Sequence, residues 1–273
     1  MKKILVPTDF SEGAYHALQY AVELAKEYGA SIDVVNAFYM PPSGSTILVD
    51  ITDVLKKSAD EAMAKLRAKV EASAMHGEVD MHFETHYGSV EQTIAYHVKH
   101  KGVDAVVMGT QGAGGITEKW LGTNASSAAK NTEVPLWVIP AGKDFRMPRK
   151  ILCATDLKMF RDEEPLEYVR QLANKFHSEV KFLHVRQDDS EKPEEKACKE
   201  WADERFPVRK PEFVFVHDDD IEDGIEDAVE DEKPDLLVVV RREYGFFKNL
   251  FHSSVTRQVV NSADLPILVL KGG

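Results

Sequence analysis

The sequence predicts an α/β protein built from two doubly wound units, each with a five-stranded parallel sheet and helices on both of its faces. Two observations lead to this fold class. Short apolar runs alternate with segments of helical period, and the same series occurs twice in 273 residues. Strands that alternate with helices favour a parallel sheet covered on both sides. Each half is long enough to bury a core of its own.

In the first half, the predicted helices are recognised by apolar residues on one face. The first helix is expected over 11–28, with Ser11 as its N-cap and Gly29 as its C-cap. Its apolar residues recur at helical spacing, at Ala14, Leu18, Ala21, Val22 and Ala25. We expect strands over 3–7, 32–38, 79–85, 104–109 and 135–139, and helices over 11–28, 50–74, 89–100 and 123–131.

The second half repeats the first. Residues 3–9 return at 150–156, an offset of 147, and residues 104–107 return at 235–238, an offset of 131. The closing strands keep the offset of 131, so the second helix of the later copy is shorter, over about 194–206. These matches predict a duplicated unit.

The two predicted domains, 1–142 and 149–273, are joined by a linker at 140–149 and differ in charge. Residues 1–149 carry 15 basic and 18 acidic side chains, whereas 150–273 carry 19 basic and 28 acidic ones. The whole chain has a net charge of −12. This excess of acid argues against general nucleic-acid binding, which needs a basic face. A small anion remains compatible, because backbone N–H groups can bind phosphate without net positive charge.

The most acidic segment runs from Asp218 to Glu232, where ten of fifteen residues are acidic and none is basic. It is either a site for a cation or basic partner, or the solvated face of a helix. We favour the helix face, because apolar residues at helical spacing form a stripe that can be buried. The stripe consists of Ile221, Ile225, Ala228 and Val229.

Cysteine content and apolar runs bear on the compartment. Cys153 and Cys198 are too few for a disulfide framework and indicate a reducing compartment. No apolar run reaches the roughly 18 residues of a transmembrane helix, and Pro7 interrupts the start too early for a secretory leader. We therefore expect a cytoplasmic protein that does not bind membranes.

The most informative motif lies where the fourth predicted strand ends. Gly109 and Gly112 follow Met108, and a Gly-Thr-Asn segment at 122–124 opens the next helix. Ligands of open α/β sheets bind outside the carboxyl ends of the strands. Glycine lets the main chain approach a ligand closely, and a helix start offers N–H groups and a positive dipole end to an anion. A glycine-rich connection without a ligand would show the same glycines.

Other motifs for chemistry are missing from the sequence. There is no Walker-type phosphate loop, no G-x-G-x-x-G after the first strand, and no nucleophile with a motif pointing to a base. His82 and His86, or His97 and His100, could lie near each other. Without further ligands at metal spacing, we interpret them as surface or hydrogen-bonded histidines and predict no metal site.

The spacing of Gly109, Gly112, Gly122 and Thr123 resembles the nucleotide-binding signature of the universal stress proteins, Gly-x2-Gly-x9-Gly-Ser/Thr. The Pro-Thr-Asp-Phe-Ser segment at 7–11 is similar to the first strand and turn of the same family. The resemblance covers both halves, so the chain looks like a tandem universal stress protein. It implies two flavodoxin-like, Rossmann-like units with strand order 3-2-1-4-5.

The resemblance also implies which residues hold an adenine nucleotide in the first half. Asp9 and Ala37 would hold the adenosine, and the glycine loop with Thr123 would hold the ribose and phosphates. Ala125 is a departure, because ATP-binding members often have a further hydroxyl residue there, and this weakens the phosphate end. The complete predicted set is Pro7, Thr8, Asp9, Ala37, Met108, Gly109, Gly112, Gly122, Thr123 and Asn124.

We therefore predict a stress-response protein whose first half binds ATP, ADP or AMP, with or without Mg²⁺. The nucleotide would act as a conformational ligand that biases assembly or the choice of an unidentified protein partner. A slow ATPase or nucleotidyl transferase is an alternative, but it needs a base or a Mg²⁺ carboxylate near the phosphates, where only Asp9 is at hand. A ligand-free interaction scaffold is the third hypothesis. No catalytic residue is assigned.

The second half is expected not to bind nucleotide in this way, since Val240, Glu243 and Ser253 stand where the first half has its three glycines. Their side chains would fill the space of the phosphates, and the glutamate would repel them. The last strands, 136–139 and 267–270, are apolar and would form sheet edges, which are usually covered. We expect them to pair in an intramolecular pseudo-dimer, or between copies in a homodimer.

Overall fold

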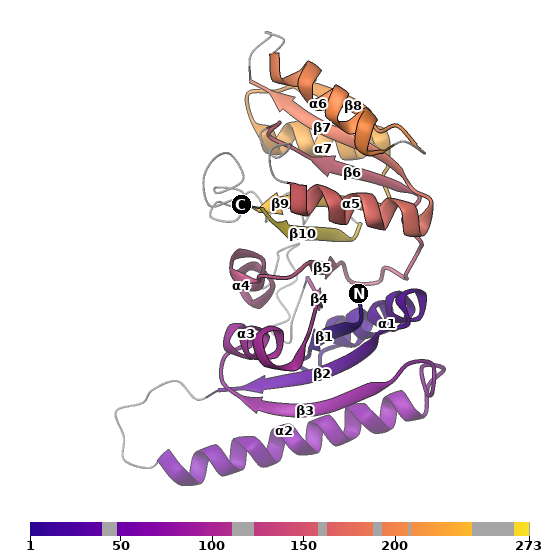
Figure 1. The fold of residues 1–273 in the computed structure, drawn as a ribbon. Helices are drawn as coiled ribbons and strands as arrows, with labels where there is room; N and C mark the ends of the chain where they lie inside the picture. The colour runs from indigo at the N-terminus through magenta and orange to yellow at the C-terminus, as the bar shows by residue number, and fades with distance from the viewer. Residues whose placement is uncertain are drawn as a thin grey trace. The chain divides into compact units, whose positions relative to one another are not determined.

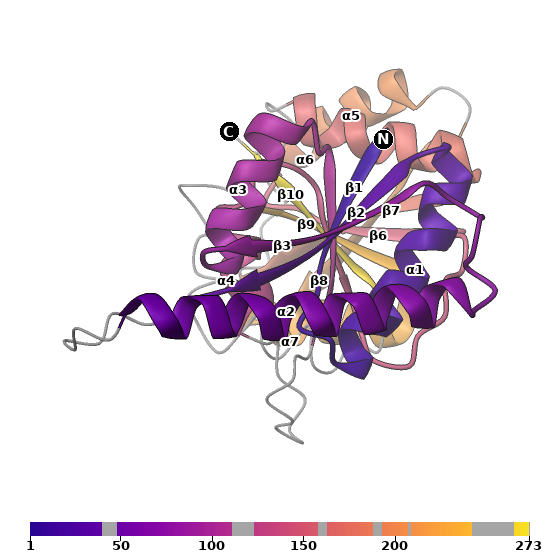
Figure 2. The same cartoon turned by 90° about the horizontal axis from the view of Figure 1, so that it is seen from below.

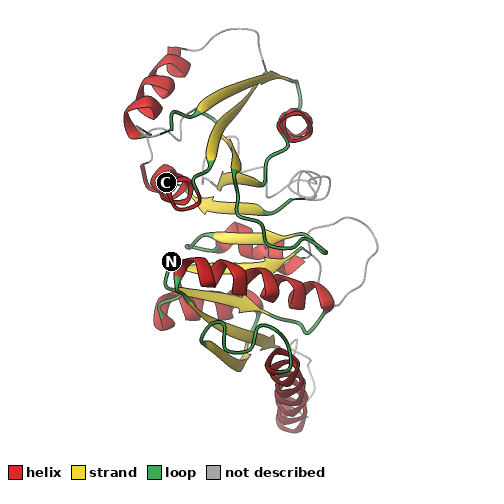
Figure 3. Cartoon of the chain, turned by 90° about the vertical axis from the view of Figure 1, so that its right-hand side faces the viewer, coloured by secondary structure: helices red, strands yellow, loops and turns green. Residues whose placement is uncertain are grey.

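A computed structural model describes most of the chain (Figure 1), namely residues 1–39, 48–110, 123–157, 163–187, 193–206, 209–241 and 265–272. The chain forms two compact units, with the change from one to the other after Phe145. Each unit has a parallel sheet with helices on both faces, as Figure 3 shows for the strands in yellow and the helices in red. The predicted α/β class is confirmed.

The first unit alternates strands with helices throughout its described part. In chain order the elements are β1 (Lys3–Pro7), α1 (Glu12–Tyr28), β2 (Ser31–Phe38), α2 (Leu48–Glu71), β3 (Met81–Tyr87), α3 (Val90–Lys101), β4 (Ala105–Gly109), α4 (Thr123–Asn131) and β5 (Leu136–Ile139). Its strands lie in the order β3-β2-β1-β4-β5, and each neighbouring pair is parallel. The predicted order 3-2-1-4-5 is confirmed.

Helix α1 begins and ends at the predicted caps. The Ser11 hydroxyl oxygen accepts a hydrogen bond of 3.1 Å from the Ala14 N–H. At the other end, Gly29 adopts a left-handed conformation with φ of 64°, which glycine tolerates without a steric penalty. The apolar face between these caps is buried against the sheet, as the helical spacing predicted.

Two elements of the first unit, β3 and α2, differ from their predicted bounds by two or more residues. Strand β3 spans 81–87 rather than 79–85, because it pairs in register with β2 along its whole length. Helix α2 begins two residues earlier and ends three residues earlier than predicted, at Glu71. It ends there because the Ser73 hydroxyl and N–H both donate to the Val70 carbonyl, at 2.7 and 3.0 Å.

Consecutive residues of β3 point to opposite faces of the first sheet and so identify the helix on each face. The Thr85 hydroxyl donates to Asp60 of α2 at 2.5 Å, whereas the ring of His86 lies 5.1 Å from the ring of Tyr96 in α3. Helix α2 therefore covers one face and α3 the other. Figure 2 shows α3 and α4 on the opposite side of these strands from α1.

The second unit repeats this architecture. Its elements are β6 (Lys150–Ala154), α5 (Glu163–Phe176), β7 (Glu179–Arg186), α6 (Pro193–Arg205), β8 (Glu212–His217), α7 (Ile221–Glu232), β9 (Leu236–Arg241) and β10 (Ile267–Lys271). The strand order is β8-β7-β6-β9-β10, equivalent to that of the first unit. In the first unit Val106 pairs with Leu136, and in the second Leu237 pairs with Ile267, which preserves the offset of 131. Duplication is confirmed.

The acidic segment forms helix α7 with a buried apolar stripe. Ile225 and Ala228 are buried, whereas Ile221 and Val229 are only half-buried, so the stripe is narrower than predicted. Gly224 is buried beside them. Across the described part of the chain, no helix has the length and apolar character needed to cross a membrane.

Candidate functional site

A tight turn after β1 orients the polar side chains at the carboxyl end of that strand. The Thr8 hydroxyl oxygen accepts from the Phe10 N–H at 3.0 Å, and Phe10 has a left-handed φ of 65°. Residues other than glycine adopt this backbone conformation rarely. Asp9 Oδ1 accepts from both the N–H and the hydroxyl of Ser11, at 3.1 and 2.6 Å. The Asp9 carboxylate is thereby held beside the start of α1.

Asn36 ties this turn to the neighbouring strand. Its side-chain Nδ2 donates to the Thr8 carbonyl at 2.7 Å, and the Asn36 side chain is buried. A buried amide needs such a partner, because an unpaired polar group in the interior is costly. Sequence reasoning did not identify Asn36, although a single amide between Val35 and Ala37 in an apolar strand could have drawn notice. Ala37, half-buried, follows it at the carboxyl end of β2.

The end of β4 lies next to the same turn. Ile4 of β1 pairs with Ala105 of β4, and continuing this parallel register brings Thr8 opposite Gly109. Between β1 and β4 the strand order reverses direction, which makes this the topological switch point where open α/β sheets bind ligands. Next to Gly109, Thr110 is buried.

Helix α4 presents its amino end at this edge, because it returns antiparallel to the strands. Thr123 is its first residue, Asn124 is exposed and Ala125 is buried. Gly112 and Gly122 lie outside the described residues, as does the side chain of Thr123. The predicted glycine loop therefore stays a prediction.

The structure thus brings six of the ten predicted residues to the carboxyl ends of three adjacent strands. They are Pro7, Thr8, Asp9, Ala37, Met108 and Gly109. This edge combines an oriented carboxylate with the positive end of a helix dipole. The carboxylate can accept hydrogen bonds from hydroxyl or amino groups at one end of a ligand, and the helix amino end can bind an anion at the other.

Three histidines of the first unit, His86, His97 and His100, gather around Tyr96 on the α3 face of the sheet. His97 is fully buried, with Nε2 3.1 Å from Glu84 Oε1 and Nδ1 3.7 Å from Asp33 Oδ2. Burial lowers the pKa of His97, although the two carboxylates act in the opposite direction. Within the described ranges, no three His, Cys, Asp or Glu side chains are arranged to hold a metal ion.

The equivalent edge of the second unit keeps the turn but loses the glycine. The Thr155 hydroxyl oxygen accepts from the Leu157 N–H at 3.0 Å, and Leu157 has a φ of 63°. Val240 is buried at the position of Gly109. The predicted substitutions Glu243 and Ser253 fall outside the residues that the structure describes.

Two doubly wound units, each with its polar turn beside the switch point, define a duplicated Rossmann-like fold. The model of the universal stress protein family matches residues 1–140 and 147–271. The chain belongs to this family and carries two of its domains in tandem.

Individual relatives agree with this assignment. A universal stress protein of Methanocaldococcus jannaschii is 32% identical over 148 residues, an alignment that covers 52% of this chain and 84% of that protein. Universal stress protein YxiE of Bacillus subtilis is 27% identical over 144 residues, covering 50% of this chain and 97% of that protein. The crystal structure of a universal stress protein from Archaeoglobus fulgidus is similar in fold, with a TM-score of 0.75 at 18% identity, covering 99% and 98% of the two chains.

Proposed function

We propose that the first unit binds an adenine nucleotide, namely ATP, ADP or AMP, and that this nucleotide acts as a conformational ligand in a stress response. One arrangement carries the proposal. The oriented Asp9 carboxylate and Gly109 stand at two strand ends on either side of the switch point, and the family's glycine and hydroxyl motif follows Gly109 in the sequence. The bound and free states would differ in their affinity for a protein partner.

Different parts of the proposed site would bind the adenosine and the phosphates. Asp9 would accept hydrogen bonds from the hydroxyl or amino groups of the adenosine, beside Ala37. The main chain at Gly109, Gly112 and Gly122, with the amino end of α4, would bind the phosphates through N–H groups and the helix dipole. A Mg²⁺ ion, where present, would be held largely by the phosphates themselves.

The test is calorimetric titration of ATP and AMP into the full chain. Gly122→Glu should reduce ATP affinity at least a hundredfold, because a carboxylate would replace phosphate. Thr123→Ala should cost about 0.5–1.5 kcal/mol for ATP, or up to ~3 kcal/mol if the hydroxyl meets a charged phosphate, and less for AMP. Asp9→Ala should weaken both nucleotides equally.

The duplicated turn supplies a matched control for this test. Asp156→Ala removes the equivalent carboxylate from the second unit and should leave nucleotide affinity unchanged. Mass spectrometry of small molecules released from protein purified without added nucleotide would identify the natural ligand. Unchanged ATP affinity in Gly122→Glu would show that the glycine loop is not the phosphate site. ATP turnover by the wild-type protein well above that of Gly122→Glu would favour an enzyme.

We further propose that the protein acts in the cytoplasm and that its last strands pair within one chain. Strands β5 and β10 each end the strand order of their own unit, and both are apolar. Uncovered apolar edges promote association. If the two strands pair within one chain, both edges are covered and sedimentation equilibrium should find a monomer at all concentrations. A stable dimer would favour pairing between copies instead.

A further inference from the structure

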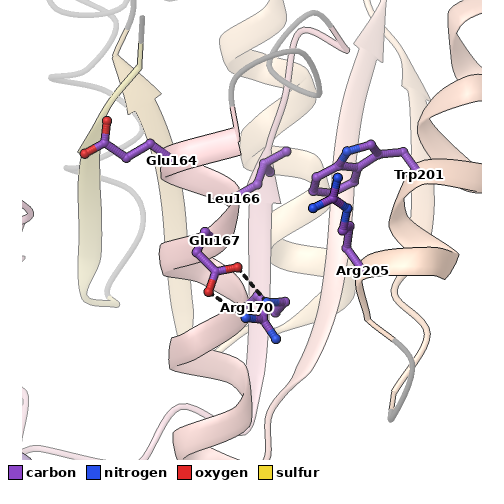
Figure 4. A pocket seen from close by; sticks show the side chains of 6 residues that line it. All are labelled: Glu164, Leu166, Glu167, Arg170, Trp201 and Arg205. Carbon is purple, nitrogen blue, oxygen red and sulfur yellow. Dashed lines mark hydrogen bonds and ion pairs between the residues drawn. The ribbon is translucent and has the colours of Figure 1, made fainter.

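A groove between helices α5 and α6 of the second unit is separate from the nucleotide edge of the first. Its volume is about 430 Å³. This falls within the range of roughly 300–1,000 Å³ that is typical of small-molecule sites. Six residues line it (Figure 4), namely Glu164, Leu166, Glu167, Arg170, Trp201 and Arg205.

The two walls of the groove differ in chemistry. On α5, Glu164, Glu167 and Arg170 follow one another at three-residue spacing, so they share a face, with the buried Leu166 beside them. On α6, Trp201 and Arg205 lie one turn apart. Leu166 is fully buried, so the half-buried Trp201 indole is the apolar group of this lining that a ligand can reach.

Both guanidinium groups in the groove are held in defined orientations. Arg170 donates from Nε and Nη2 to the two oxygens of Glu167, at 2.7 and 2.6 Å. These bonds lower the pKa of Glu167 to about 2, so the pair stays ionised at neutral pH. The guanidinium carbon of Arg205 lies 5.6 Å from the centre of the Trp201 ring, within the range of a cation–π contact.

The groove is less acidic than the unit to which it belongs. Residues 150–273 carry 28 acidic and 19 basic side chains. The lining of the groove has two guanidinium groups and two carboxylates, and the Glu164 side chain extends away from the other five (Figure 4). The Glu167 carboxylate in the wall of the groove would repel a dianion more strongly than a monoanion. The groove is therefore suited to a flat molecule with one negative charge.

The first unit has no equivalent of these charges on its first helix. The same main-chain bond closes both helices, from Ala30 to Ala25 and from Ser178 to Ala173, which gives an offset of 148. By this offset, Val22 takes the place of Arg170. The arginine–aromatic groove therefore belongs to the second unit, which lacks the glycine motif.

We propose that the α5–α6 groove binds a small aromatic monocarboxylate, with its ring against Trp201 and its carboxylate on Arg205. Guanidinium groups bind carboxylates through two parallel hydrogen bonds, so Arg205 supplies recognition as well as charge. Arg170, fixed by Glu167, adds a second guanidinium group to the lining.

The test compares indole-3-carboxylate with its neutral isostere, indole-3-carboxamide, by calorimetric titration into the full chain. The acid should bind saturably, one per chain, and at least tenfold more tightly than the amide. Arg205→Gln should weaken the acid at least tenfold and reduce its preference over the amide. Arg205 is exposed, so this variant should fold normally.

A matched control comes from the first unit. Arg67 of α2 is an exposed arginine paired with Glu71 at 2.8 Å, and Arg67→Gln should leave binding of the acid unchanged. Equal affinity for acid and amide, no saturable binding of the acid, or an unchanged affinity in Arg205→Gln would overturn the proposal. ATP affinity should be the same in Arg205→Gln and wild type, so failure here is distinguishable from failure of the nucleotide site.

Discussion

The two units keep the same turn after their first strand and differ at the strand ends beside it. Thr8 and Thr155 make equivalent hydrogen bonds, to a following residue with φ of 65° in one unit and 63° in the other. The carbonyl of each threonine is bonded by a side chain of the next strand, Asn36 Nδ2 at 2.7 Å and His184 Nδ1 at 2.9 Å. Duplication has preserved the framework of this edge while its chemistry diverged.

A second difference is an exchange of volume between strand and helix. Ala37 at the end of β2 corresponds to Val185 in β7, and by the offset of 131 Thr93 of α3 corresponds to Gly224 of α7. A Cβ on Gly224 would lie 2.7 Å from Val185 Cγ1. The larger side chain therefore sits on the helix in the first unit and on the strand in the second, where Val185 packs against Gly224 of α7.

The largest predicted effect comes from enlarging Gly224 of α7 while Val185 of β7 keeps its size. Gly224→Thr would force its Cβ into Val185 and should lower the free energy of unfolding by about 1–3 kcal/mol, as overpacking typically does. Urea denaturation of the full chain, monitored by circular dichroism, would measure the loss. The double variant Val185→Ala/Gly224→Thr copies the first unit and should recover more than half of it. Equal stability of the single and double variants would contradict a direct contact.

An intermediate effect is expected from pH, through His97 in the first unit. Burial depresses the folded-state pKa below the ordinary value of 6.5, so the unfolded chain binds more protons below that pH. The stabilisation is complete above pH 6.5 and is lost as the pH falls, by at most about 1.4 kcal/mol per pH unit. Its counterpart in the second unit, Ala228, cannot titrate.

Unfolding free energies at pH 7.5 and 5.5 would test this. Wild type should lose about 1 kcal/mol more than His97→Gln over this interval. His100→Gln, at an exposed position on the same helix, serves as the control and should behave as wild type. The same pH dependence in wild type and His97→Gln would exclude His97 as the source.

The smallest predicted effect has the opposite sign and belongs to the second unit. Burial, together with the neighbouring Asp220, Asp223 and Glu226, raises the pKa of Glu222 to about 7. The folded state then holds a proton that the unfolded state has lost, so stability decreases as the pH rises from 4.5 through 7. Because Glu222 is partly exposed, solvent screening limits the effect to less than about 1 kcal/mol.

Glu222→Gln should therefore stabilise the protein at pH 7.5 and bring no gain near pH 4.5. Glu230→Gln removes an exposed charge from the same helix and controls for the general reduction of negative charge. Thermal unfolding at the two pH values would separate the variants. An equal gain at both pH values would assign the effect to something other than the ionisation of Glu222.

The sequence predicted the features that rest on periodicity and on turn chemistry. The caps of α1 at Ser11 and Gly29 follow from local patterns. The duplication follows from the repeat of the sequence, and the strand order was implied by the resemblance to the universal stress proteins. The boundaries of β3 depended on pairing with β2, which no local pattern contains.

Tertiary contacts account for what was missed in the candidate sites. Asn36 reaches a carbonyl 28 positions away, and His97 is buried between carboxylates of two strands, so neither role is visible in a local segment. The groove of the second unit likewise depends on how α5 packs beside α6, so that Arg170 and Arg205 line one groove. Gly112 and Gly122 remain predictions from their spacing.

The difference in length between α2 and α6 has a consequence for how insertions are tolerated. Helix α2 has 24 residues and α6 has 13, a difference of 11. Eleven residues make about three full turns, since each residue turns the helix by about 100°. The point where the chain enters the helix is therefore displaced by about 16 Å along the axis but only about 20° around it. A gain or loss of whole turns keeps the two ends of the helix on the same side, so copies of this unit can change the length of the helix without turning its packing face away from the sheet.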